Sequence, residues 1–322
     1  MRQALAISGG PDAVADFSLH HRVAASIEKL RNRLHTELPE LGQDVSTWMD
    51  AIAPGGEAAN YLSDPLMFPI VQLPAWLLQS LTGSADAGFL SDVTYSTVSG
   101  YYHVRLMDNI QDGHATVEGK LLPAAGLLEQ QFRGVYEKYF SSQHPFWEHF
   151  ERFWQATSAS VEKEALLREM SLDDFREIAA DKYAAAKIPM AAAAFHSGHA
   201  ASLPLWFRFC DELARATQLL DDLLDWQDDL RAERCTYYLS HILGCKEGHE
   251  SPESYVFREG FFWGLQQLRA QTILIGDLAL ELNCGDLIHY LDQREATLRL
   301  QLIPIQQGLE HYRQLRQILG GS

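Results

Sequence analysis

The sequence has little of what marks secreted, membrane-spanning or nucleic-acid-binding proteins. Its 322 residues include only four cysteines and no CxxC pair, so neither a disulfide framework nor a zinc site is expected. No apolar run of about 18 residues and no signal-peptide core occur, so neither a membrane span nor export is expected. Lys and Arg number 26 against 43 Asp and Glu, and the formal charge of −17 argues against a nucleic-acid partner. These absences predict a cytoplasmic protein with reduced thiols.

Signals for β-strands are also scarce. Alternation of apolar and polar residues is hardly present, and no Asn-Gly hairpin turn occurs. Apolar residues recur at helical spacing instead, and 47% hydrophobic residues suffice for a sizeable core. No shift in composition marks a boundary. We therefore predict one all-α domain over residues 1–322, in which residues 1–64 form an N-terminal helix and loop region. Two of the expected helices, at about 89–112 and 204–230, carry acidic clusters.

The more unusual cluster lies in the segment Ala216–Leu230, where five aspartates fall within nine residues on a background of leucines. On a helix, Asp221, Asp225 and Asp228 or Asp229 stack along one face, while leucines cover much of the rest. Carboxylates this close repel one another unless a cation lies between them. Oxygen ligands favour a hard divalent ion, Mg²⁺ first. The segment therefore predicts a metal site at the edge of a buried helix.

A second acidic cluster ends the expected helix at about 89–112. Asp108 and Asp112 lie at i and i+4, so both carboxylates project from one face near the helix C-terminus. The helix dipole places partial negative charge at that end, so the two acids fit better with a cation present. Asn109 adds a neutral oxygen beside them. The alternative is a solvated last turn without any ligand.

The two clusters together resemble the aspartate-rich motifs of the class I isoprenoid synthases, which include trans-prenyl diphosphate synthases and class I terpene cyclases. Asp108–Asp112 sits where the first motif, usually DDxxD, belongs, with Asn109 in place of an aspartate. Gln218–Asp225 is similar to the second motif of prenyl synthases, and 109 positions separate Asp112 from Asp221. The resemblance covers about residues 65–315.

This resemblance implies a helical bundle with a central active-site cavity, and a cluster of three Mg²⁺ ions that binds the diphosphate of an allylic isoprenoid. It also implies a possible homodimer. The implied metal ligands are Asp108, Asp112, Asp221, Asp222 and Asp225.

Basic residues that could meet the diphosphate lie before and after the second motif. Arg176 precedes Asp222 by 46 positions, similar to the diphosphate-sensing Arg of terpene cyclases. Lys187 resembles the Lys of the prenyl synthase Lys-Thr motif, with Ile188 in place of Thr. A surface helix residue is the alternative for each. The implied diphosphate-binding residues are Arg176, Lys182, Lys187, Arg231 and Arg234.

Tyr101 is the aromatic residue expected to line a carbocation cavity, because it lies seven residues before Asp108 on roughly the same helix face. Ordinary core packing is its alternative. Arg176, Lys187 and Tyr101 are the residues expected to take part in catalysis.

Two elements of chain-elongating prenyl synthases are missing. Those enzymes carry a Gly-Gly-Lys-x-x-Arg element and an Arg-Arg pair that recognise isopentenyl diphosphate. At the corresponding places this chain has Phe68–Trp76 and Gly113–Lys120. The NSE-type second motif that is usual in terpene cyclases is also missing. The chain therefore looks suited to a single allylic diphosphate.

The leading hypothesis is a Mg²⁺-dependent class I terpene synthase. It would ionise a C10–C20 prenyl diphosphate, cyclise or rearrange the carbocation and release diphosphate. The first alternative is a prenyltransferase or prenyl diphosphate synthase that joins an allylic diphosphate to isopentenyl diphosphate or another acceptor. The second is a catalytically degenerate, synthase-like regulatory subunit, and an acidic all-α binding scaffold is a fourth reading.

Overall fold

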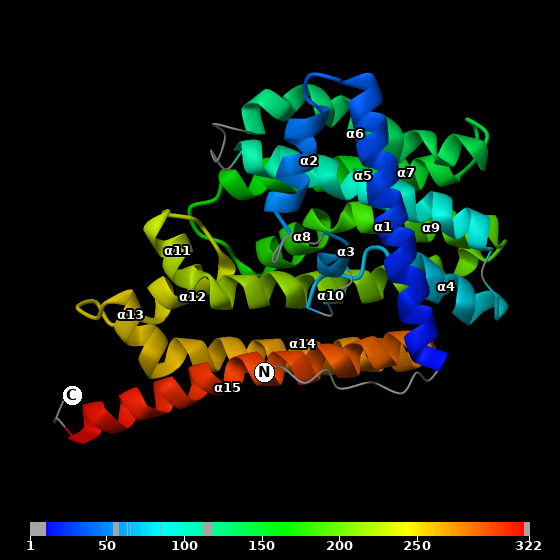
Figure 1. The fold of residues 1–322 in the computed structure, drawn as a ribbon. Helices are drawn as coiled ribbons and strands as arrows, with labels where there is room; N and C mark the ends of the chain where they lie inside the picture. The colour runs from blue at the N-terminus through cyan, green and yellow to red at the C-terminus, as the bar shows by residue number, and fades with distance from the viewer. Residues whose placement is uncertain are drawn as a thin grey trace, which may run out of the picture. The chain divides into compact units, whose positions relative to one another are not determined.

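The computed structural model describes residues 11–53, 58–62, 64, 66–84, 86–111 and 118–318. Within these ranges every regular element is a helix and no strand occurs, which confirms the prediction of an all-α chain. None of the described helices is both long and apolar enough to cross a membrane. The chain divides into two compact units, Met1–His144 and Pro145–Ser322 (Figure 1). That the whole chain forms one domain stays a prediction.

The first unit is built around α5 (Ala87–Gln111), which packs against α1 (Pro11–Glu37) and α6 (Leu122–Gly134). Gly100 permits the close approach of α6, because a Cβ atom there would lie 2.7 Å from the Phe132 ring. The remaining elements of this unit are α2 (Gly42–Ala51), α3 (Ala58–Tyr61), α4 (Leu73–Thr82) and the 3₁₀ turns η2 (Glu118–Leu121) and η3 (Tyr136–Lys138).

The second unit is organised around α10 (Leu203–Leu224), which packs against α8 (Leu172–Lys182) and α14 (Phe261–Glu281). Figure 1 shows α14 and α15 (Gly285–Ile318) running alongside α10. The other elements are α7 (Phe146–Ala165), η4 (Ala184–Ala186), α9 (Lys187–His196), η5 (Ala200–Ser202), α11 (Trp226–Arg231), α12 (Tyr237–Cys245), α13 (Pro252–Tyr255) and η6 (Val256–Gly260).

Close contact between α10 and α14 depends on a glycine beside the second acidic motif. A Cβ atom at Gly264 would lie 2.7 Å from Leu223 Cδ1 and 3.1 Å from the Tyr238 ring. The absent side chain therefore lets α14 pack directly on the helix turn that carries Asp222. Leu223 and Tyr238 are fully buried in the same apolar cluster.

The helix expected over 204–230 is interrupted at Asp225, which corrects the prediction of one continuous helix. Asp225 has φ −98° and ψ 7°, so α10 ends at Leu224 and α11 starts at Trp226. Trp226 is buried in the cluster of Leu223 and Tyr238, and its ring meets Phe257 edge-on at 6.3 Å. The turn follows from burying this indole, which helix periodicity does not reveal.

The end of α11 is fixed by a left-handed turn at Glu233, which has φ 55°. The Arg234 N–H donates to the Asp229 carbonyl at 2.9 Å, and the Glu233 N–H donates to the Leu230 carbonyl at 3.3 Å. These two bonds form a Schellman motif with Glu in the position that glycine usually takes. The motif turns the chain so that the Arg234 side chain lies 3.5 Å from the Asp229 carboxylate.

Candidate functional site

The second acidic motif lies at the C-terminal end of α10. Asp222 is only 3% exposed, and its Oδ1 accepts a hydrogen bond of 2.8 Å from Gln218 Nε2, one turn earlier. Asp221 and Asp225 are open to solvent on the neighbouring positions. Asp229, on α11, is buried. The helix break at Asp225 therefore leaves one buried and two accessible carboxylates at a single helix end.

Three of these carboxyls, Asp221, Asp222 and Asp229, have pKa values raised first by burial. Burial raises the pKa of Asp222 to about 7. The pKa of Asp221 rises to about 6, first because the surrounding protein desolvates the carboxylate and then because Asp225 adds negative charge. Asp221 keeps a solvent-exposed surface, although the protein around it partly desolvates its carboxylate. A bound cation would relieve both causes, which is the electrostatic condition for a metal site.

Lys182 is the cation of α8 that faces this cluster. Its charge lowers the pKa values of Asp221, Asp222 and Asp229. Its Nζ also forms an ion pair of 2.6 Å with Glu164 Oε2 on α7. Lys182 is therefore shared between a structural partner and the acidic motif, and its own acid partner reduces the charge available to the cluster.

Sequence reasoning missed a second cation, Arg294. This residue lies on α15, is 5% exposed, and its Nη2 donates to Thr217 Oγ1 at 3.1 Å. Thr217 is one turn before Asp221 on α10, and the charge of Arg294 lowers the pKa of Asp221. Nothing in the sequence indicates this contact, because 77 positions separate Arg294 from Thr217.

Arg231 and Arg234 follow the acidic motif but hold different positions. Arg231 pairs with Asp228 one turn earlier, and both side chains are largely exposed. Arg234 pairs with the buried Asp229 and is half-exposed. Of these two, Arg234 is the residue that the fold ties to the acidic motif.

Lys187 is brought to a different part of α10. Its side chain is 8% exposed, and its Nζ pairs with Asp211 and lies 5.2 Å from the centroid of the Phe153 ring. Eleven residues separate Asp211 from Asp222, which is about 16 Å along the helix axis. The structure thus places Lys187 with its own carboxylate and apart from the acidic motif.

Arg176 lies on the exposed side of α8, where it is 3.5 Å from Asp173. Its backbone carbonyl accepts a hydrogen bond of 2.9 Å from Arg215 Nε on α10. Burial raises the pKa of Tyr237 at the start of α12, and the charge of Arg176 offsets part of that shift. Arg176 therefore faces Tyr237, whereas Lys182, at the end of the same helix, faces the aspartates.

The first acidic motif belongs to the first unit. Asp108, on the last turns of α5, is half-exposed and lies 3.2 Å from Arg105 Nη1. Asn109 is buried. Asp112 lies outside the described residues, so the pair expected from the sequence is described for Asp108 alone.

Tyr101 lies on α5 two turns before Asp108. It packs between the Tyr61 and Tyr102 rings, at centroid distances of 6.2 and 5.2 Å. Burial raises its pKa, and the Tyr61 charge and hydrogen bond add to the shift. Tyr101 thus belongs to an aromatic cluster of the first unit.

The carboxylates of the second motif suit a metal ion that is also held by other ligands. Among the described residues, no three His, Cys, Asp or Glu side chains are grouped so that they alone could hold one ion. Mg²⁺ in enzymes commonly takes one or two carboxylates and completes its octahedron with substrate phosphates and water. Asp221 and Asp222 supply that kind of partial, oxygen-only ligand set.

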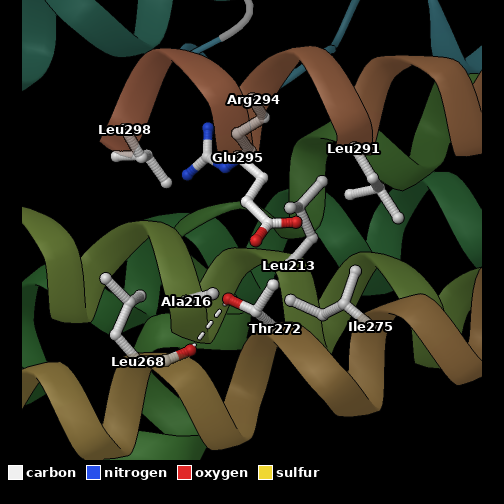
Figure 2. A pocket seen from close by; sticks show the side chains of 9 residues that line it. All are labelled: Leu213, Ala216, Leu268, Thr272, Ile275, Leu291, Arg294, Glu295 and Leu298. Carbon is white, nitrogen blue, oxygen red and sulfur yellow. Dashed lines mark hydrogen bonds between the residues drawn. The ribbon is translucent and has the colours of Figure 1, made fainter. Parts of the chain in front are cut away.

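A small cavity lies between α10, α14 and α15, close to Thr217 and Arg294. Its volume is about 50 Å³, which is room for only a few water molecules. Figure 2 shows Thr272 turned back onto the Leu268 carbonyl, and Arg294 and Glu295 on the α15 side. This cavity is too small for an isoprenoid chain.

A larger cavity of about 390 Å³ lies at the other end of α10, among His149, Phe195, Leu203 and Phe207. Leu203 and Asp222 are 19 residues apart, about 28 Å along the helix. This cavity is therefore separate from the acidic motif.

Comparison with known proteins supports the fold. No family model and no curated protein matches the sequence. Solved structures do match. The octaprenyl pyrophosphate synthase of Helicobacter pylori gives a TM-score of 0.61 at 11% identity, covering 84% of this chain and 98% of that one. The T. brucei farnesyl diphosphate synthase complexed with bisphosphonate gives 0.57 at 12%, with coverages of 87% and 98%. A polyprenyl synthase of Roseobacter denitrificans gives 0.56 at 14%, with 84% and 99%.

The chain therefore has the all-α fold of the isoprenoid synthases, as the two aspartate motifs indicated. At 11–14% identity the likeness shows the fold alone.

Proposed function

We propose that the protein is a Mg²⁺-dependent prenyltransferase that binds an allylic diphosphate and passes its prenyl group to an acceptor. The main support is the crowded acidic motif at the end of α10, in a fold shared with prenyl diphosphate synthases. Burial raises the pKa values of Asp221 and Asp222, and a bound cation would favour their ionised forms. The ligands proposed at this helix end are Asp221, Asp222 and Asp225, while Asp108 and Asp112 in the first unit stay ligands predicted from the sequence.

Bound Mg²⁺ would neutralise the charge that develops on the leaving diphosphate. The chain's own residues would orient that group. Lys182 would donate charge-assisted hydrogen bonds to diphosphate oxygens, because its charge already reaches the carboxylates of the motif. Arg234 and Arg176 are further candidates, with Arg231 and Lys187 less well placed. Tyr101, in the aromatic cluster of the first unit, stays the aromatic residue predicted from the sequence to shield an allylic cation from water.

Cyclisation of a single allylic diphosphate is the second candidate function. It is favoured by the absence of the two cationic elements that recognise isopentenyl diphosphate. Phe68–Trp76, which stands in place of the Gly-Gly-Lys element, contains no Lys or Arg. Such a chain would need no second diphosphate.

One experiment separates the candidates. The protein is incubated with Mg²⁺ and geranyl, farnesyl or geranylgeranyl diphosphate, each with and without isopentenyl diphosphate. Released diphosphate and organic products are measured. Release that requires the acceptor, with a longer prenyl diphosphate as product, supports the prenyltransferase. Release without acceptor, with a hydrocarbon or alcohol product, supports the cyclase. If no mixture gives more diphosphate release than the Asp222→Asn variant does, the result would support a catalytically degenerate subunit.

A further inference from the structure

A thiol and an imidazole lie side by side on α12, away from the acidic motif. Cys245 Sγ is 3.7 Å from His241 Nδ1, and the two residues are one helix turn apart. Of the four cysteines, Cys245 alone is exposed. The pair combines an accessible nucleophile with a group that can hydrogen-bond to it.

The His241 ring is held in a fixed orientation. It stacks on the Trp263 indole with 3.5 Å between ring centroids and 7° between the planes. Its Nε2 atom is buried and has no hydrogen-bond partner among the described residues. A buried N–H without an acceptor is less favourable than a bare ring nitrogen, so the proton belongs on Nδ1, toward the sulfur. Burial lowers the pKa of His241, which keeps the ring neutral near pH 7.

A second donor approaches the sulfur from α13. Tyr255 is 5% exposed, and burial raises the pKa of its phenol, with a further contribution from its hydrogen bond to the Cys245 side chain. Two donors directed at one sulfur stabilise a thiolate relative to a thiol. The charged groups around the pair are Arg258, Glu250 and Glu259, which bond to one another, and Lys246, next to Cys245 in the chain.

The other cysteines lack these features. Cys210 is buried, and burial raises its pKa to about 12. Burial also raises the pKa values of Cys284 and of the half-buried Cys235. Cys235 has a neighbouring hydroxyl, Ser240, at 3.9 Å, but among the described residues no imidazole is its hydrogen-bond partner. They therefore provide internal references for Cys245.

We propose that Cys245 is a covalent modification site for low-molecular-weight disulfides, where His241 and Tyr255 stabilise the attacking thiolate. The thiol proton passes to water, and the sulfur attacks one sulfur atom of the disulfide RSSR. The S–S bond of RSSR breaks as the new S–S bond forms. Cys245 is oxidised to the mixed disulfide, and RS⁻ leaves as the reduced product and takes up a proton.

The test uses the full chain and oxidised glutathione at pH 7. Samples are quenched with acid over time, and peptide mass spectrometry measures modification at each cysteine. We expect Cys245 to react at least about tenfold faster than Cys235. His241→Phe keeps an aromatic ring on Trp263 but removes the donor, and should slow Cys245 at least about threefold. His249→Phe is the matched control, because His249 is 88% exposed and lies in the loop after α12, four residues beyond Cys245.

Equal rates at Cys235 and Cys245, or a wild-type rate in His241→Phe, would overturn the proposal. The same slowing in His249→Phe would also overturn it. Circular dichroism checks that each variant is folded. If His241→Phe does not fold, Tyr255→Phe takes its place, since it removes one donor and keeps the buried ring; an unchanged rate in that variant would likewise contradict the proposal.

Discussion

Asp211 near the middle of α10 and Asp222 near its C-terminal end lie on the same helix face but are neutralised differently. Asp211 and Asp222 are eleven residues apart, about three turns, and so project in nearly the same direction. Asp211 is paired with the buried Lys187. Among the described residues Asp222 has the amide of Gln218 as its hydrogen-bond partner, and burial raises its pKa to about 7. One carboxylate has a cation from the chain beside it, and for the other we propose a bound metal ion as the cation.

This difference changes which lysine fits the diphosphate role. Lys187 matches the family motif by position in the sequence, but its ammonium group is already neutralised by Asp211. Lys182 matches no family motif, yet its charge favours the ionised forms of three aspartates of the acidic segment. We therefore propose a structural role for Lys187 and propose Lys182 as the diphosphate contact.

The largest expected effect is on the free energy of unfolding, at the Asp211–Lys187 pair. Asp211→Ala leaves the Lys187 ammonium buried without its anion and should lower the free energy of unfolding by about 3 kcal/mol. Lys187→Met removes the buried charge and packs beside Phe153, so it should cost less than about 1 kcal/mol. Urea denaturation measures both. The double variant should recover most of the loss caused by Asp211→Ala alone.

Activity measurements on Lys187→Met also test whether Lys187 has a structural role. A structural Lys187 predicts diphosphate release close to that of the wild type. A loss of more than about tenfold in a folded Lys187→Met protein would show that the lysine serves the substrate, and the contrast between Asp211 and Asp222 would fail.

The next largest effect is on activity, at the acidic end. Asp222→Asn keeps the shape and can still accept the Gln218 hydrogen bond, but it removes an anionic ligand. We expect diphosphate release to fall at least about 100-fold, about 2.7 kcal/mol in the barrier. Stability without metal should not fall, because a buried carboxyl has been replaced by a neutral group. A destabilised Asp222→Asn protein would mean that this carboxylate is structural, like Asp211.

A smaller effect is expected at Lys182, which has a close matched control. Lys182–Glu164 and Lys163–Glu177 both join α7 to α8. Lys182→Met should raise the diphosphate concentration needed for half-maximal thermal stabilisation with Mg²⁺ about tenfold, about 1.4 kcal/mol. Lys163→Met should leave that concentration unchanged. Equal shifts in the two variants would indicate a general loss of helix pairing rather than a lost ligand contact.

The sequence predicted the features that depend on near neighbours in the chain. Helical spacing gave the all-α class, and Gln218 and Asp222 meet because they are one turn apart. The break at Asp225 could not be predicted, because it depends on where the Trp226 ring is buried. Contacts between helices also left no signal: Lys187 meets Asp211 across 24 positions and Arg294 meets Thr217 across 77. Such pairs are set by helix packing, which periodicity alone does not determine.

The smallest effect concerns Asp181, whose pKa is raised by burial and by Glu177 and Asp211, and lowered by Lys187. A folded-state pKa above the unfolded value of about 3.9 gives a stability contribution that is lost as pH rises through the folded pKa. Asp181→Asn should therefore match the wild type near pH 4 and be more stable at pH 7.5 by a few tenths of a kcal/mol. Urea denaturation at the two pH values measures this difference. In a Lys187→Met background the gain at pH 7.5 should increase, because the charge that favours ionised Asp181 is gone. An unchanged gain would mean that the Lys187 charge does not act on Asp181, which would contradict the position of Lys187 beside Asp211.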